Sequence, residues 1–360
     1  MIDMKKALSF TLLIFILLPG SAFHDMILVI VLAYVWRDEI KSRADRYWKY
    51  ANAGLWSLLC LSTLLLMPRP FALPSDRVRL LHLNEKGERI SAPLSHWAVN
   101  LLLPEETICA VSSFVPLTPM KHLIPVGDGI LKDYYYELKT GGLFNIGRAF
   151  RSNNLAIESP MSGAITQAIN QFSGGKTRSV YVIRPKDYDK NRQYPVLFFA
   201  HGFLGNWKMY TGLLRKIKGH IVVCIGTEDL SGIFTRRHVD EIKTVYLPML
   251  EDMGYSVDRK AVSLMGLSNG GSAVDAAYST ADDYKNLIYV STEMNRTHKT
   301  SAKVMVIGGG RDHCAPSMKN GMAKLVSNGV NTAFCFDENH THLKLISDMD
   351  NCINFLNNEL

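Results

Sequence analysis

Short apolar runs alternate with longer amphipathic stretches from about residue 155 to the C-terminus. Strands of a parallel sheet have this apolar pattern because helices cover both faces of the sheet. The expected strands are Leu155–Glu158, Arg178–Arg184, Pro195–Ala200, Ile221–Ile225, Val262–Met265, Leu287–Val290, Lys303–Ile307 and Thr332–Phe336. The expected helices are Trp207–Lys218, Arg237–Met253, Gly271–Thr280, Ser317–Val326 and Leu343–Leu356. This pattern predicts an α/β domain over residues 155–360, with a mostly parallel sheet between two layers of helices.

The N-terminal part of the chain has a different pattern, with three apolar runs over residues 1–67. They are Ala7–Phe23, Met26–Trp36 and Ala51–Met67. Each is short of the roughly 20 apolar residues that a helix needs to cross a bilayer, but small flanking residues can extend it, so we expect about three transmembrane helices. The first run also fits a cleaved signal peptide, because Lys5 and Lys6 precede it and the small residues Gly20-Ser21-Ala22 follow it.

The basic residues beside these runs predict the orientation of the chain. The loop between the second and third runs is rich in basic residues, whereas residues 19–25 contain no lysine or arginine. Basic loops stay in the cytoplasm, so everything after Met67 is expected on the other side of the membrane. Arg69, Arg77 and Arg79 weaken this prediction without reversing it.

Residues 68–154 give the least regular pattern. Pro68 to Pro74 contains three prolines and indicates a stiff linker. Val78 to Ile90 fits a hairpin that turns at Glu85-Lys86-Gly87. The aromatic-rich stretches Tyr134–Tyr136 and Leu143–Phe150 fit a lid, a membrane-facing surface or an extension packed on the core. We therefore assign 68–154 as a linker followed by an N-terminal extension or lid.

Composition excludes some classes of function. The chain has 360 residues and a formal charge of +7, part of which comes from the basic residues around the apolar runs. No basic stripe is interleaved with aromatic residues, so nucleic acid is not an expected partner. Six cysteines are present, and neither a C-x-x-C nor an H-x-x-x-H spacing indicates a metal site.

The sharpest local signal is Gly266-Leu267-Ser268-Asn269-Gly270, a G-x-S-x-G pattern between an expected strand and an expected helix. Glycines on both sides allow a sharp turn that places Ser268 at its apex in a strained conformation. The helix N-terminus behind the serine favours developing negative charge. We therefore predict Ser268 as a nucleophile.

Two further features follow expected strands, where the carboxyl ends of a parallel sheet collect ligands. His201-Gly202-Phe203 follows the strand that ends at Ala200, and the N–H groups of Phe203 and Asn269 are candidates for an oxyanion hole. The alternative is an ordinary glycine turn with a structural His201. Asp312 follows a run of glycines and is the expected acid, with Glu293 and Asp337 as fallbacks.

Two histidines after the last expected strand compete for the role of base. The apolar spacing from Leu343 onward predicts a helix that begins close to His342, with Thr341 as its N-cap. His340 then stays in the loop, free to lean toward Ser268, so it is the favoured base. His342 is the second candidate base, and His313 is expected to be a loop residue.

The motifs HGFLGN and GLSNGG, in this order with a later acid and histidine, resemble the α/β-hydrolase fold over about Leu155 to Leu360. They are most similar to secreted esterases and to the polyhydroxybutyrate-depolymerase-like and dienelactone-hydrolase-like branches. The segment Tyr181–Tyr188 resembles the entry strands of these branches, and Asn339-His340 resembles their usual setting for the histidine. The resemblance implies an acyl-transfer hydrolase with Ser268 as nucleophile, a histidine base and Asp312 as orienting acid, without a metal or organic cofactor.

These observations together predict a membrane-anchored serine esterase that cleaves a small-molecule or lipid-like carboxyl ester outside the cytoplasm. An ester is expected rather than an amide, because the chain is too short for the large propeller or cap domain expected in oligopeptidases. A membrane-tethered peptidase or acyltransferase with the same triad is the nearest alternative. A non-catalytic binding protein that has kept the fold is the other.

Overall fold

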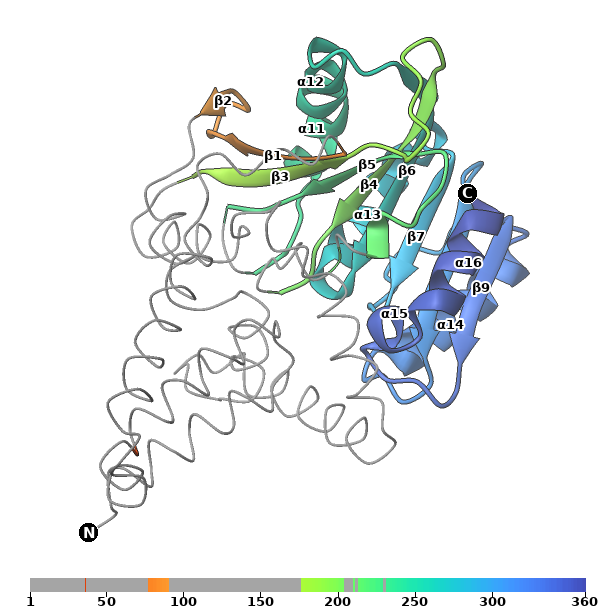
Figure 1. Cartoon of the computed structure of the whole chain (residues 1–360). Coiled ribbons are helices and arrows are strands. Elements are labelled where there is room, and N and C mark those ends of the chain that lie inside the picture. The colour runs from red at the N-terminus through yellow and green to blue at the C-terminus, as the bar shows by residue number, and fades with distance from the viewer. Residues whose placement is uncertain (1–35, 37–76, 91–175, 204–209, 211–212, 229–230) are drawn as a thin grey trace.

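A computed structural model describes residue 36 and residues 77–90, 176–203, 210, 213–228 and 231–360 (Figure 1). Their centre is a nine-stranded mixed sheet with the order β2-β1-β3-β5-β4-β6-β7-β8-β9. Neighbouring strands are parallel from β5 to β9, whereas β1 and β3 run antiparallel to their neighbours. The strands are β1 Val78–Leu83, β2 Arg89–Ile90, β3 Arg178–Ile183, β4 Tyr194–Ala200, β5 Ile221–Ile225, β6 Val257–Leu267, β7 Asn286–Val290, β8 Lys303–Gly309 and β9 Thr332–Asp337.

The prediction of a mostly parallel α/β sheet is confirmed. Every expected strand from Arg178 onward forms, while Leu155–Glu158 lies outside the described residues. All residues of β3, β5 and β7 are buried, as the continuous apolar runs predicted. Strand β6 begins at Val257, five residues before the expected Val262. The apolar pattern did not predict this first part because it is polar and partly exposed.

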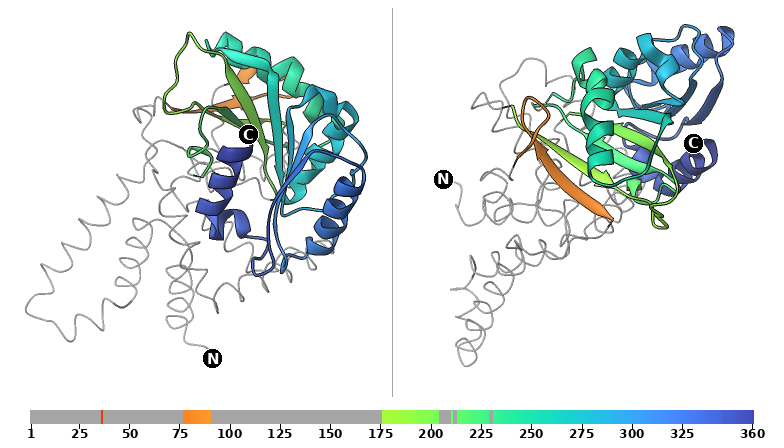
Figure 2. Two further views of the ribbon diagram at one scale, coloured as in Figure 1. Left: turned by 90° about the vertical axis from the view of Figure 1, so that its right-hand side faces the viewer. Right: turned by 90° about the horizontal axis from the view of Figure 1, so that it is seen from above.

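Helices cover both faces of the sheet, and successive strand residues alternate between two apolar cores (Figure 2). Val196 and Phe198 of β4 belong to one core, and Leu197 and Phe199 belong to the other. The first core is covered by α11 Arg236–Glu241, the π-helical turn η1 Ile242–Tyr246, α12 Leu247–Asp252, α13 Gly271–Ala277, the 3-10 turn η3 Tyr278–Asp283 and α14 Ala315–Ser327. The second is covered by α15 Lys344–Ser347 and α16 Met349–Glu359 together with Tyr210, Leu213, Leu214 and Ile217.

The predicted hairpin over Val78–Ile90 forms, and it extends the main sheet. Strand β1 pairs with β3 along its whole length, from Val78 opposite Ile183 to Leu83 opposite Arg178. The sequence pattern places this segment in the N-terminal extension, apart from the hydrolase domain expected at 155–360. The pairing instead makes β1 and β2 outer strands of the same sheet, because β3 needs a partner on that edge.

Within the described ranges, no helix combines the length and the apolar character that a membrane crossing requires. Apart from Trp36, the three apolar runs of residues 1–67 lie outside those ranges. The aromatic stretches Tyr134–Tyr136 and Leu143–Phe150 also lie outside them.

Candidate active site

Ser268 lies at the tip of a sharp turn between β6 and α13. It is the first residue of the 3-10 turn η2, Ser268–Gly270, and its φ of 53° places it in the left-handed region. Few residues other than glycine adopt this conformation, and it commonly marks a functional site. The strained apex that the G-x-S-x-G pattern predicted is therefore present.

Glycines allow this turn to pack directly against the end of β4. A Cβ on Gly270 would lie 2.3 Å from the carbonyl oxygen of Ala200, and one on Gly202 would lie 3.0 Å from the Cβ of Ser268. Any side chain at Gly270 would collide with backbone atoms. The close approach brings the turn after β4 next to Ser268, so that two strand ends build one site.

The structure brings Ser268, His342 and Asp312 into one hydrogen-bonded chain. Nε2 of His342 lies 3.0 Å from Oγ of Ser268, and Nδ1 of the same ring lies 3.0 Å from Oδ1 of Asp312. A carboxylate only accepts, so Nδ1 carries the ring proton and Nε2 accepts from the serine hydroxyl. The Asp312 side chain is fully buried and the His342 side chain is 11% exposed. These residues come from the ends of β6, β8 and β9.

The expectation that His340 would lean toward Ser268 is wrong. The nitrogens of its ring lie 3.5 Å from Oγ of Ser347 and 3.6 Å from Oδ2 of Asp348, beside helix α15. Its backbone contacts the segment after β8, since its carbonyl oxygen accepts a hydrogen bond from the N–H of Arg311 at 3.0 Å. A Cβ on Gly309 would lie 2.0 Å from that oxygen, so the chain at His340 is pressed against the end of β8.

The physical reason for this error is the start of the last helix. Helix α15 begins at Lys344 rather than beside His342. Thr341 accepts the N–H of Leu343 with Oγ1 at 3.2 Å, which forms a tight turn ahead of the helix. His342 therefore lies in the turn, where its side chain is directed across the sheet edge. The fallback acids Glu293 and Asp337 are both exposed, and Asp337 instead accepts the N–H of Asn339 at 2.8 Å.

Buried His201 fixes the turn that carries Phe203. Nδ1 of His201 lies 2.5 Å from the carbonyl oxygen of Gly202, and Nε2 accepts the N–H of Thr227 at 3.3 Å. The carbonyl of Gly202 and the N–H of Phe203 belong to one planar trans peptide, so they point in opposite directions. By holding the carbonyl, His201 directs the N–H of Phe203 away from itself. His201 therefore has the structural role that the alternative gave it, and the oxyanion role of the Phe203 N–H stays a prediction.

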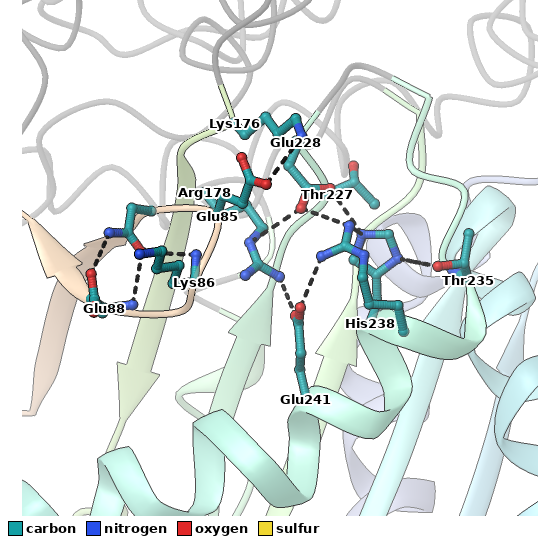
Figure 3. A network of polar contacts seen from close by, with 12 residues as sticks. Glu85, Lys86, Glu88, Lys176, Arg178, Thr227, Glu228, Thr235, His238 and Glu241 are labelled. Atoms are coloured by element: carbon teal, nitrogen blue, oxygen red, sulfur yellow. Dashed lines mark hydrogen bonds and ion pairs between the residues drawn. The ribbon is translucent and has the colours of Figure 1, made fainter.

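An ion network lies next to Thr227, the residue whose N–H donates to His201 (Figure 3). Arg178 of β3 is fully buried between two carboxylates, with an ion pair to Glu241 and a 3.5 Å contact from Nε to Glu228. Glu228 also contacts Arg237 at 2.8 Å and His238 at 2.9 Å. Burial alone would raise the pKa of Glu228, but these cationic partners outweigh it and lower the pKa to about 2. Glu228 follows Thr227, so the network anchors the strand end that holds His201.

Sequence reasoning missed one further contributor. The hydroxyl of Thr292, after β7, donates to the carbonyl oxygen of Ser268 at 2.6 Å. Gly271 makes room for it, since a Cβ there would lie 2.2 Å from the threonine oxygen. This bond fixes the strained turn from the side opposite Gly202. A threonine after a strand carries no distinctive pattern, so the sequence offered no signal for it.

The charge of Asp312 is stabilised by its neighbours. Burial by itself would raise the pKa of this carboxyl group, but His342, the N–H of Cys314 and His313 outweigh burial and lower it. Oδ1 accepts the N–H of Cys314 at 2.8 Å, and Nδ1 of His313 lies 3.3 Å from the same oxygen. An ionised Asp312 is the form that can orient the ring of His342 and stabilise a positive charge on it.

Four side chains at this end of the site also form a group that fits a metal ion. One ligand atom from each of Asp312, His313, Cys314 and His342 lies within 4.8 Å of all the others. The ring of His313 packs against that of His342 with centroids 4.6 Å apart. Asp312, His313 and Cys314 are adjacent in the sequence, but His342 lies thirty positions after Asp312. The sequence alone therefore did not indicate the cluster.

No protein-family model and no curated protein matches the sequence. Among solved structures, the chain is similar to the Pyrococcus horikoshii acylaminoacyl peptidase, with 14% identity over 50% of this chain and 39% of that one, and a TM-score of 0.41. It is also similar to a ferulic acid esterase, with 18% identity, coverage of 51% and 92%, and a TM-score of 0.41. A Pyrobaculum calidifontis esterase gives 14% identity, coverage of 51% and 79%, and a TM-score of 0.42. Identities and TM-scores this low say nothing about the substrate of this chain.

Proposed function

We propose that this protein is a serine hydrolase of the α/β-hydrolase type that cleaves carboxyl esters through an acyl-enzyme. The observation that carries the proposal is the hydrogen-bonded chain from Ser268 through His342 to Asp312. A serine hydroxyl is a weak nucleophile until a base removes its proton, and a buried carboxylate fixes the tautomer of that base. The residues needed for this chemistry lie together at one sheet edge.

Each residue then has a defined step. Nε2 of His342 takes the proton of Ser268 as Oγ attacks the acyl carbon, and Asp312 stabilises the resulting imidazolium. The N–H groups of Phe203 and Asn269 are the donors proposed for the oxyanion of the tetrahedral intermediate. The imidazolium returns the proton to the leaving alcohol. Water then attacks the acyl-enzyme with His342 again as base, which releases the acid and restores Ser268.

A fluorophosphonate probe tests the nucleophile. The full-length protein should be labelled, and Ser268→Ala should abolish the label because the attacking oxygen is gone. Ser327→Ala, which removes an exposed hydroxyl on α14, is the matched control and should label normally. Absence of label, or equal labelling of Ser268→Ala, would overturn the serine-hydrolase proposal.

The preference for esters needs its own comparison. A p-nitrophenyl ester and a p-nitroanilide with the same acyl group differ only in the leaving group, so their kcat/KM values separate esterase from peptidase. We expect faster turnover of the ester, and a series of acyl chain lengths would then distinguish small-molecule from lipid-like substrates. Faster turnover of the anilide would favour a peptidase, and acyl transfer to an added alcohol in place of hydrolysis would favour an acyltransferase.

We propose further that residues 1–67 anchor the protein in a membrane with the hydrolase outside the cytoplasm. The support is the three apolar runs and the basic loop between the second and third. Protease added to intact cells stripped of any wall should digest the part after Met67. Protection of that part until the cells are lysed would reverse the orientation.

A further inference from the structure

We propose that Asp312, His313, Cys314 and His342 form an inhibitory site for a divalent transition-metal ion of the zinc type. The inference rests on the proposed function, since the ion would act on the base of the triad. It is carried by the mutual distances of the four ligand atoms, all within 4.8 Å. A tetrahedral zinc ion with ligands at about 2.0–2.3 Å places those ligands roughly 3.3–3.8 Å apart, so the site needs shifts of about 1 Å or less.

The donor set matches the preference of zinc. One thiolate, two imidazoles and one carboxylate are its common ligands, and together they give four-coordinate sites. With an ionised Asp312 and a Cys314 thiolate, the two negative charges neutralise the ion. Calcium and magnesium prefer sets made only of oxygen ligands, so this cluster discriminates against them.

A second observation at the same place points to a missing ligand. The Asp312 side chain is fully buried, yet its Oδ2 finds no hydrogen-bond partner in the part of the chain that the structure describes. A buried carboxylate oxygen without a partner has lost its contacts with water and gained nothing in return. A bound ion would supply the missing partner. The His313 side chain is 43% exposed beside it, so an ion has a path from solvent.

Binding at this site would switch off the base by changing its tautomer. The nitrogen of His342 on the side of Asp312 is Nδ1, and Nε2 faces Ser268. When the ion takes Nδ1, the ring proton moves to Nε2, which can then no longer accept the proton of Ser268. Cys314 releases one proton as it becomes a thiolate, so one proton leaves for each ion bound at a pH where both imidazoles are neutral.

The first experiment measures binding without activity. Co²⁺ is added to full-length Ser268→Ala protein, and its absorption is followed for tetrahedral d–d bands and for thiolate-to-cobalt charge transfer. We expect both signals, displacement of Co²⁺ by Zn²⁺, and loss of the charge-transfer band in the Ser268→Ala/Cys314→Ser protein. The matched control is the Ser268→Ala/Cys335→Ser protein, because the thiol of Cys335 lies on β9 outside the cluster. This protein should keep the charge-transfer band.

The second experiment measures inhibition, with each variant compared to its own rate without metal. Zn²⁺ should inhibit ester hydrolysis, and EDTA should restore the rate. His313→Ala and Cys314→Ser should each raise the inhibitory Zn²⁺ concentration by at least about tenfold, the effect that even an outer-shell partner has in metal sites. Thermal unfolding of both variants checks that they are folded.

The outcomes separate the two proposals. No Co²⁺ signal, or a charge-transfer band that persists without Cys314, overturns the metal site while fluorophosphonate labelling of Ser268 can still stand. Metal binding to a protein that the probe never labels overturns the hydrolase and leaves the ion site. Inhibition that is equal in wild type, His313→Ala and Cys314→Ser means that the ion acts elsewhere, and the inference fails.

Discussion

At the scale of single residues, the two candidate bases differ in what their rings contact. His342 lies between a hydroxyl and a buried carboxylate, each at 3.0 Å. His340 contacts Asp348 at 3.6 Å, on a different side of the loop. A base must reach the proton that it removes, so His342 is the proposed base on geometry alone.

Separate alanine variants test this assignment. His342→Ala should lower kcat by several orders of magnitude, because Ser268 loses its base and Asp312 loses its cationic partner. His340→Ala should leave kcat within about an order of magnitude, and it serves as the matched control two positions away. Steady-state kinetics on one ester suffices. A dead His340→Ala protein beside an active His342→Ala protein would contradict the geometry of the site.

Ser268 and Asp312 could be predicted from the sequence because each depends on a strand and the glycines beside it. Such patterns are local, and the strand ends of a parallel sheet converge on one edge. The orientation of His342 depends on the turn before a short helix, and the start of α15 lies only one residue after the expected Leu343. The bond from Thr292 to the carbonyl of Ser268 joins two loops, and no local pattern encodes it.

At the scale of elements, the network around Arg178 joins β3, the end of β5 and helix α11 (Figure 3). We expect Arg178→Met to lower the free energy of unfolding by up to about 3–5 kcal/mol, because Glu228 and Glu241 would lose their only fully buried cation and keep the half-exposed Arg237. Lys216→Met, which removes a half-exposed pair with Asp350, should change it by about 1 kcal/mol or less. Denaturant unfolding monitored by circular dichroism measures both.

A second expectation at this scale concerns the variant Arg178→Met/Glu241→Gln. Removing the charge of Glu241 should recover part of the lost stability, because Arg237 would then have only the Glu228 carboxylate to neutralise. If Arg178→Met alone is as stable as wild type, the network is not holding β3 to α11.

His82 makes the docking of β1 sensitive to pH. Burial lowers its pKa from 6.5 to about 4, and its Nδ1 lies 3.1 Å from Oγ of Ser179 on β3. Between these values the unfolded chain binds a proton that the folded chain excludes, so stability falls as the pH drops from about 6.5 toward 4. The full difference of about 2.5 units corresponds to about 3 kcal/mol. Melting temperatures across this range should fall less steeply for His82→Gln than for wild type, and parallel curves would contradict the expectation.

The elements themselves were largely predictable, and the errors have local causes. Apolar runs located the strands from Arg178 onward because both faces of those strands are buried. The hairpin was predicted, but its place was not, since antiparallel pairing of β1 with β3 joins positions about a hundred residues apart. The predicted last helix is interrupted at Asp348, which has a non-helical φ of −120°.

At the scale of the whole molecule, the pairing of β1 with β3 places strands from outside residues 155–360 in the main sheet. Without β1, strand β3 would expose an unpaired edge whose residues are all buried in the complete sheet. Leu83 of β1 is itself fully buried in the first core. The outer hairpin therefore completes the core next to Arg178, behind the turn that carries Phe203.

A protein comprising residues 76–360 should thus be soluble, unfold cooperatively and react with a fluorophosphonate at Ser268. One comprising residues 155–360 should aggregate or melt at a clearly lower temperature, because unpaired strand edges promote association and the first core lacks Leu83. Size-exclusion chromatography and thermal unfolding compare the two, with the full chain as reference. Within the longer protein, Leu83→Ala isolates the packing contribution of β1 and should cost about 2–5 kcal/mol. Equal melting temperatures for the two proteins would show that the hairpin packs on a sheet that is already stable, and the boundary at residue 155 would then be the correct one.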